Sequence, residues 1–166
     1  MYEKSVELMN RAVADEMQAV HQYMYFHFYC DDQGYDPLSA LFRQTAIEEM
    51  MHVERIAERI LFLKGEVEMK TSAEVDKIND VRQMLERAMA IEQGSVRDYN
   101  QWANECATHN DAASKKIFED LVADEERHFD QYETQKDHLD KFGEQFLALQ
   151  SIERSKNLAG PPGQGA

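Results

Sequence analysis

The chain is poor in the residues that build turns, disulfide frameworks and membrane spans. Its 166 residues include seven glycines, three prolines and two cysteines. Two cysteines cannot make a disulfide framework, and scarce turn residues disfavour a fold of many short strands. No stretch approaches the ~20 apolar residues that cross a bilayer, and the N-terminus has no basic segment followed by an apolar run. We therefore expect a cytoplasmic protein with no membrane partner.

Basic residues are also in short supply. Lysine and arginine total 18 against 32 aspartates and glutamates, which gives a net charge of −14. Nucleic-acid binding needs a basic surface, so this balance argues against a nucleic-acid partner. An acidic surface instead attracts cations.

Apolar residues recur at helical spacing through most of the chain, which predicts an all-α fold. We expect helices over residues 4–32, 37–64, 80–109 and 111–139, and a short fifth helix over 142–152. Gly34 is expected to end the first helix in a left-handed turn. Asp36 and Pro37 are expected to begin the second as N-cap and first-turn proline.

The connection between the second and third helices, about residues 65–80, is long. It contains a potential capping box from Thr71 to Glu74, which predicts a short helical turn. A long crossover is one known way to connect a four-helix bundle. We assign residues 1–155 to one domain and residues 156–166 to a flexible tail rich in glycine and proline.

Two Glu-x-x-His motifs stand out, Glu49 to His52 and Glu125 to His128. Residues three apart on a helix lie on one face, so each motif can present a carboxylate and an imidazole to one metal ion. One such motif is weak support for a metal site in an acid-rich chain. Two such motifs, with further glutamates at equal spacing before them, support a metal site more strongly.

That spacing indicates an internal repeat. Glu16 precedes Glu49 by the same distance along the chain as Glu92 precedes Glu125. Tyr23 and Tyr99 occupy the same place, two helical turns after Glu16 and Glu92. The chain therefore looks like two copies of one helical hairpin. The number of residues from Glu16 to Glu92 is the shift along the sequence that superposes one copy on the other. We call this number of residues the repeat interval.

Folding both hairpins into one bundle would bring four carboxylates and two imidazoles together. Four buried carboxylates are costly unless their charge is compensated. Two divalent cations would neutralise them, and carboxylate with imidazole suits iron or manganese. A buried site for two metal ions is the simplest interpretation.

The chain resembles bacterioferritins and the related Dps-like ferritins, within the ferritin-like superfamily, over about residues 4–150. The stretches that carry the resemblance are 15–23 (DEMQAVHQY), 48–54 (EEMMHVE), 59–65 (RILFLKG) and 124–128 (DEERH). It implies a ferritin-like four-helix bundle with the long crossover between its second and third helices.

The resemblance also implies a di-iron ferroxidase site with two iron ions per subunit. Glu49 and Glu125 would bridge the ions and act as the catalytic carboxylates. The terminal ligands would be Glu16, His52, Glu92 and His128.

By the same resemblance, the protein would oxidise Fe²⁺ with hydrogen peroxide or dioxygen and store the ferric product, which protects against oxidative stress. The subunits would form a hollow homo-oligomeric shell. We favour 12 copies, as in Dps-like ferritins, over the 24 of bacterioferritins.

Two further residues have family counterparts. Met50 matches the methionine that ligates haem between two bacterioferritin subunits, although we favour an assembly without haem. Tyr23 or Tyr99 would hydrogen-bond a bridging glutamate and orient it in a redox role outside the ligand shell. A core tyrosine with a satisfied hydroxyl is an equal alternative.

Cys30 and Cys106 occupy equivalent positions in the two hairpins. If the crossover makes the second and third helices parallel, the cysteines lie on opposite sides of the site, on the order of 40 Å apart. They could not form a disulfide, and they do not match the cysteine pair of thioferritins. We interpret them as small buried apolar residues.

Two other functions remain open. The first is a ferritin-like peroxidase of the rubrerythrin kind, which stores no iron; that family usually adds a four-cysteine module that two distant cysteines cannot build. The second is a non-enzymatic helical assembly protein with structural carboxylates.

Overall fold

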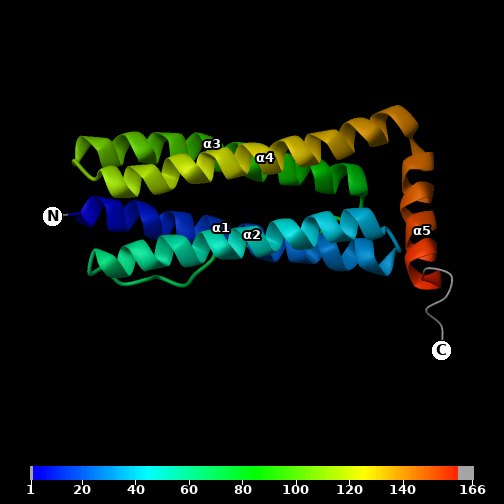
Figure 1. Ribbon diagram of the computed structural model, residues 1–166, viewed down its shortest axis with the longest axis horizontal. Helices are drawn as coiled ribbons and strands as arrows, with labels where there is room; N and C mark the ends of the chain where they lie inside the picture. The colour runs from blue at the N-terminus through cyan, green and yellow to red at the C-terminus, as the bar shows by residue number, and fades with distance from the viewer. Residues whose placement is uncertain (1, 161–166) are drawn as a thin grey trace.

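Five helices and no strand make up the regular structure of residues 2–160, the part of the chain that the computed structural model describes. The helices are α1 (Glu3–Asp32), α2 (Asp36–Phe62), α3 (Val81–Thr108), α4 (Ala112–Phe142) and α5 (Glu144–Ala159). The first four lie along one long axis, and α5 crosses one end of the bundle (Figure 1). The predicted all-α bundle with a fifth helix is confirmed. None of these helices is long and apolar enough to cross a membrane.

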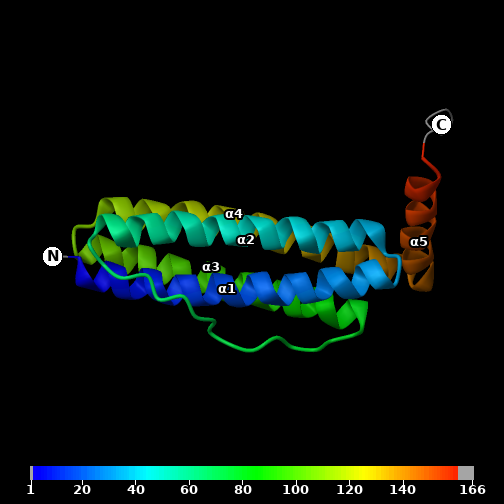
Figure 2. The same ribbon diagram turned by 90° about the horizontal axis from the view of Figure 1, so that it is seen from below.

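The crossover between α2 and α3 runs along the outside of the bundle for most of its length (Figure 2). It connects the end of α2 to the opposite end of the molecule, so α2 and α3 run in the same direction. α1 and α3 are therefore antiparallel, as the length of the connection predicted.

Side-chain amides on α1 hold the crossover in place. Asn10 Nδ2 donates to Glu66 O (2.9 Å), and Asn10 Oδ1 accepts from the backbone N–H of Glu68 (2.8 Å). Gln22 makes a similar pair of bonds with the backbone of Asp76 (3.0 and 2.8 Å). These bonds fix an extended backbone.

The helical turn predicted from Thr71 to Glu74 is therefore wrong. This part of the crossover contains a bend and no helix. The backbone N–H of Ser72 donates to Ala14 O on α1 (3.1 Å) instead of entering a local turn. A hydrogen bond to α1 thus replaces the local bonds of the predicted capping box.

A glycine in the left-handed region ends α1, as predicted, and aspartates cap the starts of α3 and α4. Gly34 adopts φ 78° after α1, and the side chains of Asp80 and Asp111 accept backbone hydrogen bonds at the starts of α3 and α4. The exception is Asp36, which is the first residue of α2 and makes no capping bond. Its carboxylate lies 3.3 Å from Arg154 on α5, so that ion pair takes the place of the expected cap.

α5 is longer than predicted and closes one end of the bundle. Gln150 Oε1 accepts from the backbone N–H of Leu38, the third residue of α2 (2.9 Å). The helix continues to Ala159, past residue 156 where we placed the start of the flexible tail, so the described part of that segment is largely helical. Residues 161–166 of the expected tail lie outside the described residues.

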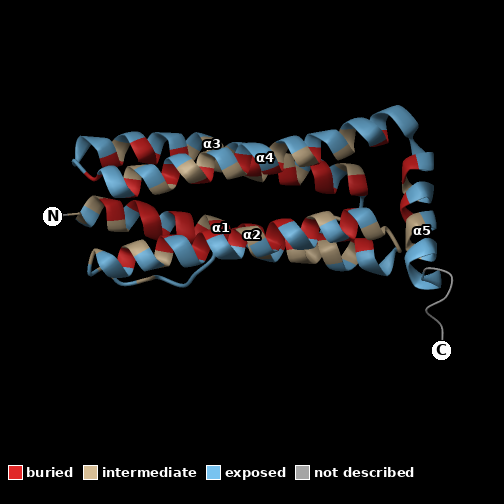
Figure 3. Cartoon of the chain, viewed as in Figure 1, coloured by how far each residue is buried: buried red, intermediate tan, exposed pale blue. Residues whose placement is uncertain are grey.

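The buried apolar side chains form two cores, one toward each end of the bundle. Buried residues occur along all five helices (Figure 3). The core at the α5 end contains Tyr23, Phe26, Cys30, Phe42 and Tyr132. Several members have a counterpart one repeat interval later in the other core, which contains Tyr99, Trp102, Cys106 and Phe118. The internal repeat therefore extends from the acidic motifs into the packing.

The two cysteines lie in different cores, as predicted. Cys30 and Cys106 are free and buried. Burial raises the pKa of the Cys30 thiol to about 12, so this side chain stays a neutral apolar group at physiological pH.

Gly65 and Gly94 offer a matched test of packing at the start of the crossover. A Cβ at Gly65 would lie 2.6 Å from Val6 Cγ1, whereas a Cβ at Gly94 would meet nothing within 4 Å. We expect Gly65→Ala to lower the free energy of unfolding by about 1–3 kcal/mol through overpacking. Gly94→Ala, inside α3, should raise it by up to about 1 kcal/mol. Denaturant unfolding checks both, and equal changes in the two variants would contradict this account.

Candidate metal centre

The structure brings the six predicted acidic and imidazole side chains together in the middle of the bundle. α1 contributes Glu16, and α3 contributes Glu92. α2 and α4 each contribute a Glu-x-x-His motif. All six side chains are buried, and the most exposed of them, His52, is 6% exposed.

The six residues divide into two overlapping groups. In each group the potential ligand atoms lie within 4.8 Å of one another. The groups are Glu16, Glu49, His52 and Glu125, and Glu49, Glu92, Glu125 and His128. Glu49 and Glu125 belong to both groups, which is the geometry that a pair of bridging carboxylates requires.

Both imidazoles turn Nδ1 toward the carboxylates. His52 Nδ1 lies 2.9 Å from Glu49 Oε2 and 3.1 Å from Glu125 Oε1. His128 Nδ1 lies 3.3 Å from an oxygen of each of the same two glutamates. The ring centroids are 6.0 Å apart, so the imidazoles flank the two shared carboxylates.

Several of these inward-facing atoms lack a hydrogen bond. Within residues 2–160, the buried side-chain atoms without a partner include Glu49 Oε2, His52 Nδ1, Glu92 Oε2 and Glu125 Oε1. Buried polar atoms in folded proteins are usually hydrogen-bonded. Carboxylate oxygens and imidazole nitrogens are good ligands for iron and manganese. The atoms present therefore fit two divalent cations.

The electrostatics of the metal-free cluster lead to the same interpretation. Burial raises the pKa of Glu49 and Glu125, and the charge of Glu16 raises both further. Burial alone would lower the pKa of His52 and His128, but the close carboxylates around them, Glu125 above all, raise it well above its usual value. Without metal, the cluster therefore binds protons that reduce its negative charge.

Two carboxylates outside the cluster fix the orientation of the imidazoles. His52 Nε2 lies 3.1 Å from Asp124 Oδ2, and His128 Nε2 lies 2.6 Å from Glu48 Oε2. A hydrogen bond at Nε2 leaves Nδ1 free to face a metal, and such outer partners usually tune metal affinity. Each imidazole is held by the other hairpin, because Asp124 is on α4 and Glu48 is on α2.

Our sequence reasoning gave no role to Glu48 and Asp124. The signal was present, because each immediately precedes a motif glutamate and the two are separated by the repeat interval. Arg127 Nη2 contacts Glu48 Oε2 at 2.5 Å and Asp124 Oδ1 at 3.5 Å, which joins the two outer carboxylates. Burial opposes ionisation of Glu48, but the bonds from Arg127 and His128 lower its pKa to about 2.

The expected hydrogen bond from a tyrosine to a bridging glutamate is wrong. Tyr23 donates to Glu92 Oε1 and Tyr99 donates to Glu16 Oε1, both at 2.5 Å. These are the glutamates that the family resemblance implies as terminal ligands. Antiparallel packing of α1 against α3 explains the change of partner, because each tyrosine lies opposite the first glutamate of the other hairpin.

Met50 lies apart from this centre. It follows Glu49 on α2, but half of its surface is exposed, as is that of Met51. Its role as a haem ligand stays a prediction.

The chain is similar to known proteins over most of its length. The family described as the ferritin-like domain matches residues 6–142. Bacterioferritin from Desulfovibrio desulfuricans is 33% identical over 145 residues, which cover 87% of this chain and 81% of the relative. Bacterioferritin from Rhodobacter capsulatus is 35% identical and covers 88% of this chain and 91% of the relative.

Solved structures give the same result. An X-ray structure of Desulfovibrio desulfuricans bacterioferritin, described with its diiron site in different catalytic states, has a TM-score of 0.89. It is 31% identical, and the match covers 98% of this chain and 94% of that one. Bacterioferritin BfrA from Mycobacterium tuberculosis has a TM-score of 0.86 at 30% identity, with 92% and 96% covered.

Removing either outer carboxylate should weaken metal binding. We expect Glu48→Ala or Asp124→Ala to lower the affinity for Co²⁺ by roughly tenfold to a hundredfold, because an imidazole loses the partner that orients it. Glu126→Ala is the matched control, since this neighbouring glutamate is exposed. Calorimetric titration measures the affinities, and equal losses in all three variants would show a general effect of charge.

Metal binding should also release protons. Raised pKa values keep protons on Glu49, Glu125 and both imidazoles of the metal-free cluster. Metal ligands must be deprotonated, so the affinity for Co²⁺ should rise with pH and fall as protons compete. Titrations in two buffers of different ionisation enthalpy count the protons released. A binding enthalpy independent of the buffer would contradict the prediction.

Proposed function

The chain belongs to the family of ferritin-like domains, and from this membership we propose that it oxidises Fe²⁺ at the buried centre and stores the ferric product. The observation that carries the proposal is the pair of four-residue groups that share Glu49 and Glu125. Fe²⁺ is the substrate. Glu49 and Glu125 bridge the two ions, and the terminal ligands are Glu16 and His52 on one side and Glu92 and His128 on the other.

The residues of the centre supply charge and orientation. Four carboxylates compensate two divalent cations, so Fe²⁺ enters a site whose negative charge would otherwise be costly to bury. Asp124 and Glu48 hold the imidazoles with Nδ1 inward. Tyr23 and Tyr99 orient the two terminal glutamates through their hydroxyls.

The reaction transfers electrons from Fe²⁺ to a small oxidant. Two Fe²⁺ ions supply the two electrons that reduce hydrogen peroxide to water or dioxygen to peroxide. We propose one of these as the oxidant, so the reaction removes free Fe²⁺ and protects against oxidative stress. The redox step belongs to the iron, and the protein supplies binding and electrostatics.

We further propose that the subunits assemble into a hollow cytoplasmic shell. We favour a shell of 12 copies, and a shell of 24 copies is the alternative. Several large apolar side chains on α2 are exposed to solvent, which supports contacts between subunits. They are Ile47, Met50, Met51, Leu61 and Phe62. Met50 is the residue that would ligate haem at such an interface, although we favour a shell without haem.

Replacing two ligands tests the oxidation site. We expect Glu49→Ala combined with His52→Ala to abolish rapid Fe²⁺ oxidation while the circular dichroism of the helices is retained. Glu54→Ala, an exposed acid on the same helix, should oxidise Fe²⁺ at the normal rate. Fast oxidation by the double variant would show that another site carries the reaction.

Measurements on the native assembly separate storage from the alternatives. Light scattering gives the number of subunits, and the visible absorption spectrum reports bound haem. Iron analysis after aerobic loading should find far more iron than two ions per subunit. A plateau at two ions would favour a peroxidase that stores no iron, and no iron at all would favour a structural assembly.

A further inference from the structure

Tyr132 on α4 has a buried hydroxyl that has no role in the metal centre described above. The side chain is fully buried in the core at the α5 end. In the described part of the chain its hydroxyl has no hydrogen-bond partner. An unpaired buried hydroxyl is destabilising, and phenylalanine would fill nearly the same space without it. The presence of this hydroxyl therefore suggests a hydrogen-bond acceptor that is not part of the polypeptide.

The internal repeat shows that this hydroxyl has no counterpart in the core at the opposite end of the bundle. The residue one repeat interval before Tyr132 is Ile56, which is equally buried. The same comparison pairs Thr45, on α2 beside Tyr132, with Leu121. The end of the bundle next to α5 thus buries two hydroxyls where the opposite end buries two aliphatic side chains.

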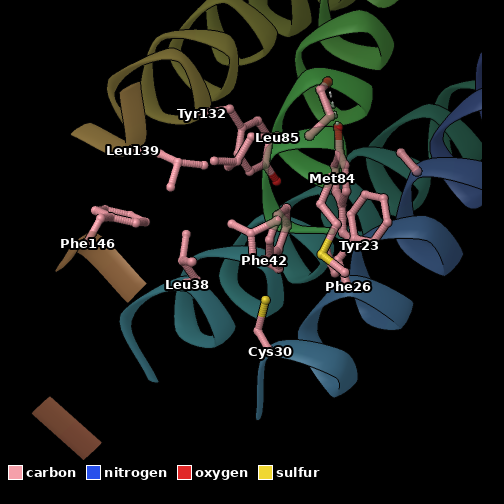
Figure 4. Close-up of a cluster of buried hydrophobic side chains, with 14 residues drawn as sticks. Tyr23, Phe26, Cys30, Leu38, Phe42, Met84, Leu85, Tyr132, Leu139 and Phe146 are labelled. Atoms are coloured by element: carbon pink, nitrogen blue, oxygen red, sulfur yellow. Dashed lines mark hydrogen bonds between the residues drawn. The ribbon is translucent and has the colours of Figure 1, made fainter. Parts of the chain in front are cut away.

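The surrounding aromatic rings do repeat, which makes the difference local. Tyr23 and Phe42 pack on Tyr132, each with ring centroids at 5.4 Å. Their counterparts in the second hairpin, Tyr99 and Phe118, pack on each other at 5.7 Å. The two hydroxyls are therefore an addition to a shared aromatic scaffold. Figure 4 shows Tyr132 beside Leu85 with its hydroxyl oxygen pointing into the core.

Tyr132 is also placed near the metal centre. It lies one helical turn after His128, so both side chains project from one face of α4. Its neighbour Tyr23 donates to Glu92 of the same half of the centre. Burial, and then the charge of Glu92, raise the pKa of Tyr132 well above its usual value, so the hydroxyl stays protonated and can donate.

Thr45 does not satisfy this donor. Its hydroxyl donates to Leu41 O, one turn earlier on α2 (2.9 Å). The Thr45 hydroxyl lies close enough to Tyr132 to lower its pKa, but it makes no hydrogen bond of normal geometry with the Tyr132 hydroxyl. The two hydroxyls instead form a small polar niche, defined by Thr45 and Tyr132, within an otherwise apolar core.

We propose that this niche binds a small hydrogen-bond acceptor, such as water or a small anion, beside the Glu92–Glu125–His128 half of the centre, with the Tyr132 hydroxyl as donor. The two metal positions are then chemically unequal, because only one has a protein donor for an external ligand. This proposal rests on the proposed function, since it requires metal at the centre.

Azide binding to the Co²⁺-loaded protein tests the niche without any turnover. Co²⁺ gives a visible spectrum that changes when azide binds near the metal. We compare the wild type with Tyr132→Phe. The control is Tyr25→Phe, which removes a hydroxyl that donates to Asn79 on the crossover (3.0 Å). We expect azide to bind about tenfold more weakly to Tyr132→Phe and with unchanged affinity to Tyr25→Phe.

The unfolding midpoint of the metal-free variants completes the test. Tyr132→Phe should unfold at the wild-type temperature or above it, because the hydroxyl has no bond within the protein. A clearly lower midpoint would show that the hydroxyl has a partner in the protein, which overturns the proposal. Azide affinity equal to the wild type, or a wild-type spectrum insensitive to azide, would overturn it too. Failure of the wild type to bind Co²⁺ would instead refute the proposed function.

Discussion

The burial of four carboxylates in one pocket is the constraint on which the rest of this structure depends. Such a cluster is stable only if its negative charge is compensated. Bound protons compensate part of this charge in the metal-free protein, and two divalent cations would take their place and compensate all of it. The two apolar cores on either side keep the pocket closed and the ligand atoms facing inward. Stability and metal binding are therefore properties of the same side chains.

Neither hairpin can form this centre alone. Glu16 receives its hydrogen bond from Tyr99, and Glu92 receives its bond from Tyr23. Each outer carboxylate likewise contacts an imidazole of the other hairpin. Glu49, from the first hairpin, belongs to both ligand groups. The internal repeat thus produces a centre with nearly two-fold symmetry, in which each half completes the other. Tyr132 is a local departure from that symmetry.

The sequence predicted the fold and the meeting of the six side chains because both depend on spacing along helices. Periodicity located the helices, and the equal spacing of the glutamates in the two hairpins aligned them before any tertiary contact was known. The partners of Tyr23 and Tyr99 depend on how α1 lies against α3, which spacing alone does not give. The bend near Ser72 was missed because a hydrogen bond to Ala14 replaces the local one. Glu48 was overlooked because acids beside a motif are common in an acidic chain.

The crossover has a consequence for how the centre assembles. It is pinned to α1 by Asn10 and Gln22, and within residues 2–160 it is the covalent link between the two hairpins. Joining two binding partners by a linker of matched span gives them a high effective concentration. Two separate hairpins would part on dilution, each with an incomplete ligand set. The joined hairpins instead meet within one molecule, so the pocket can form at any protein concentration.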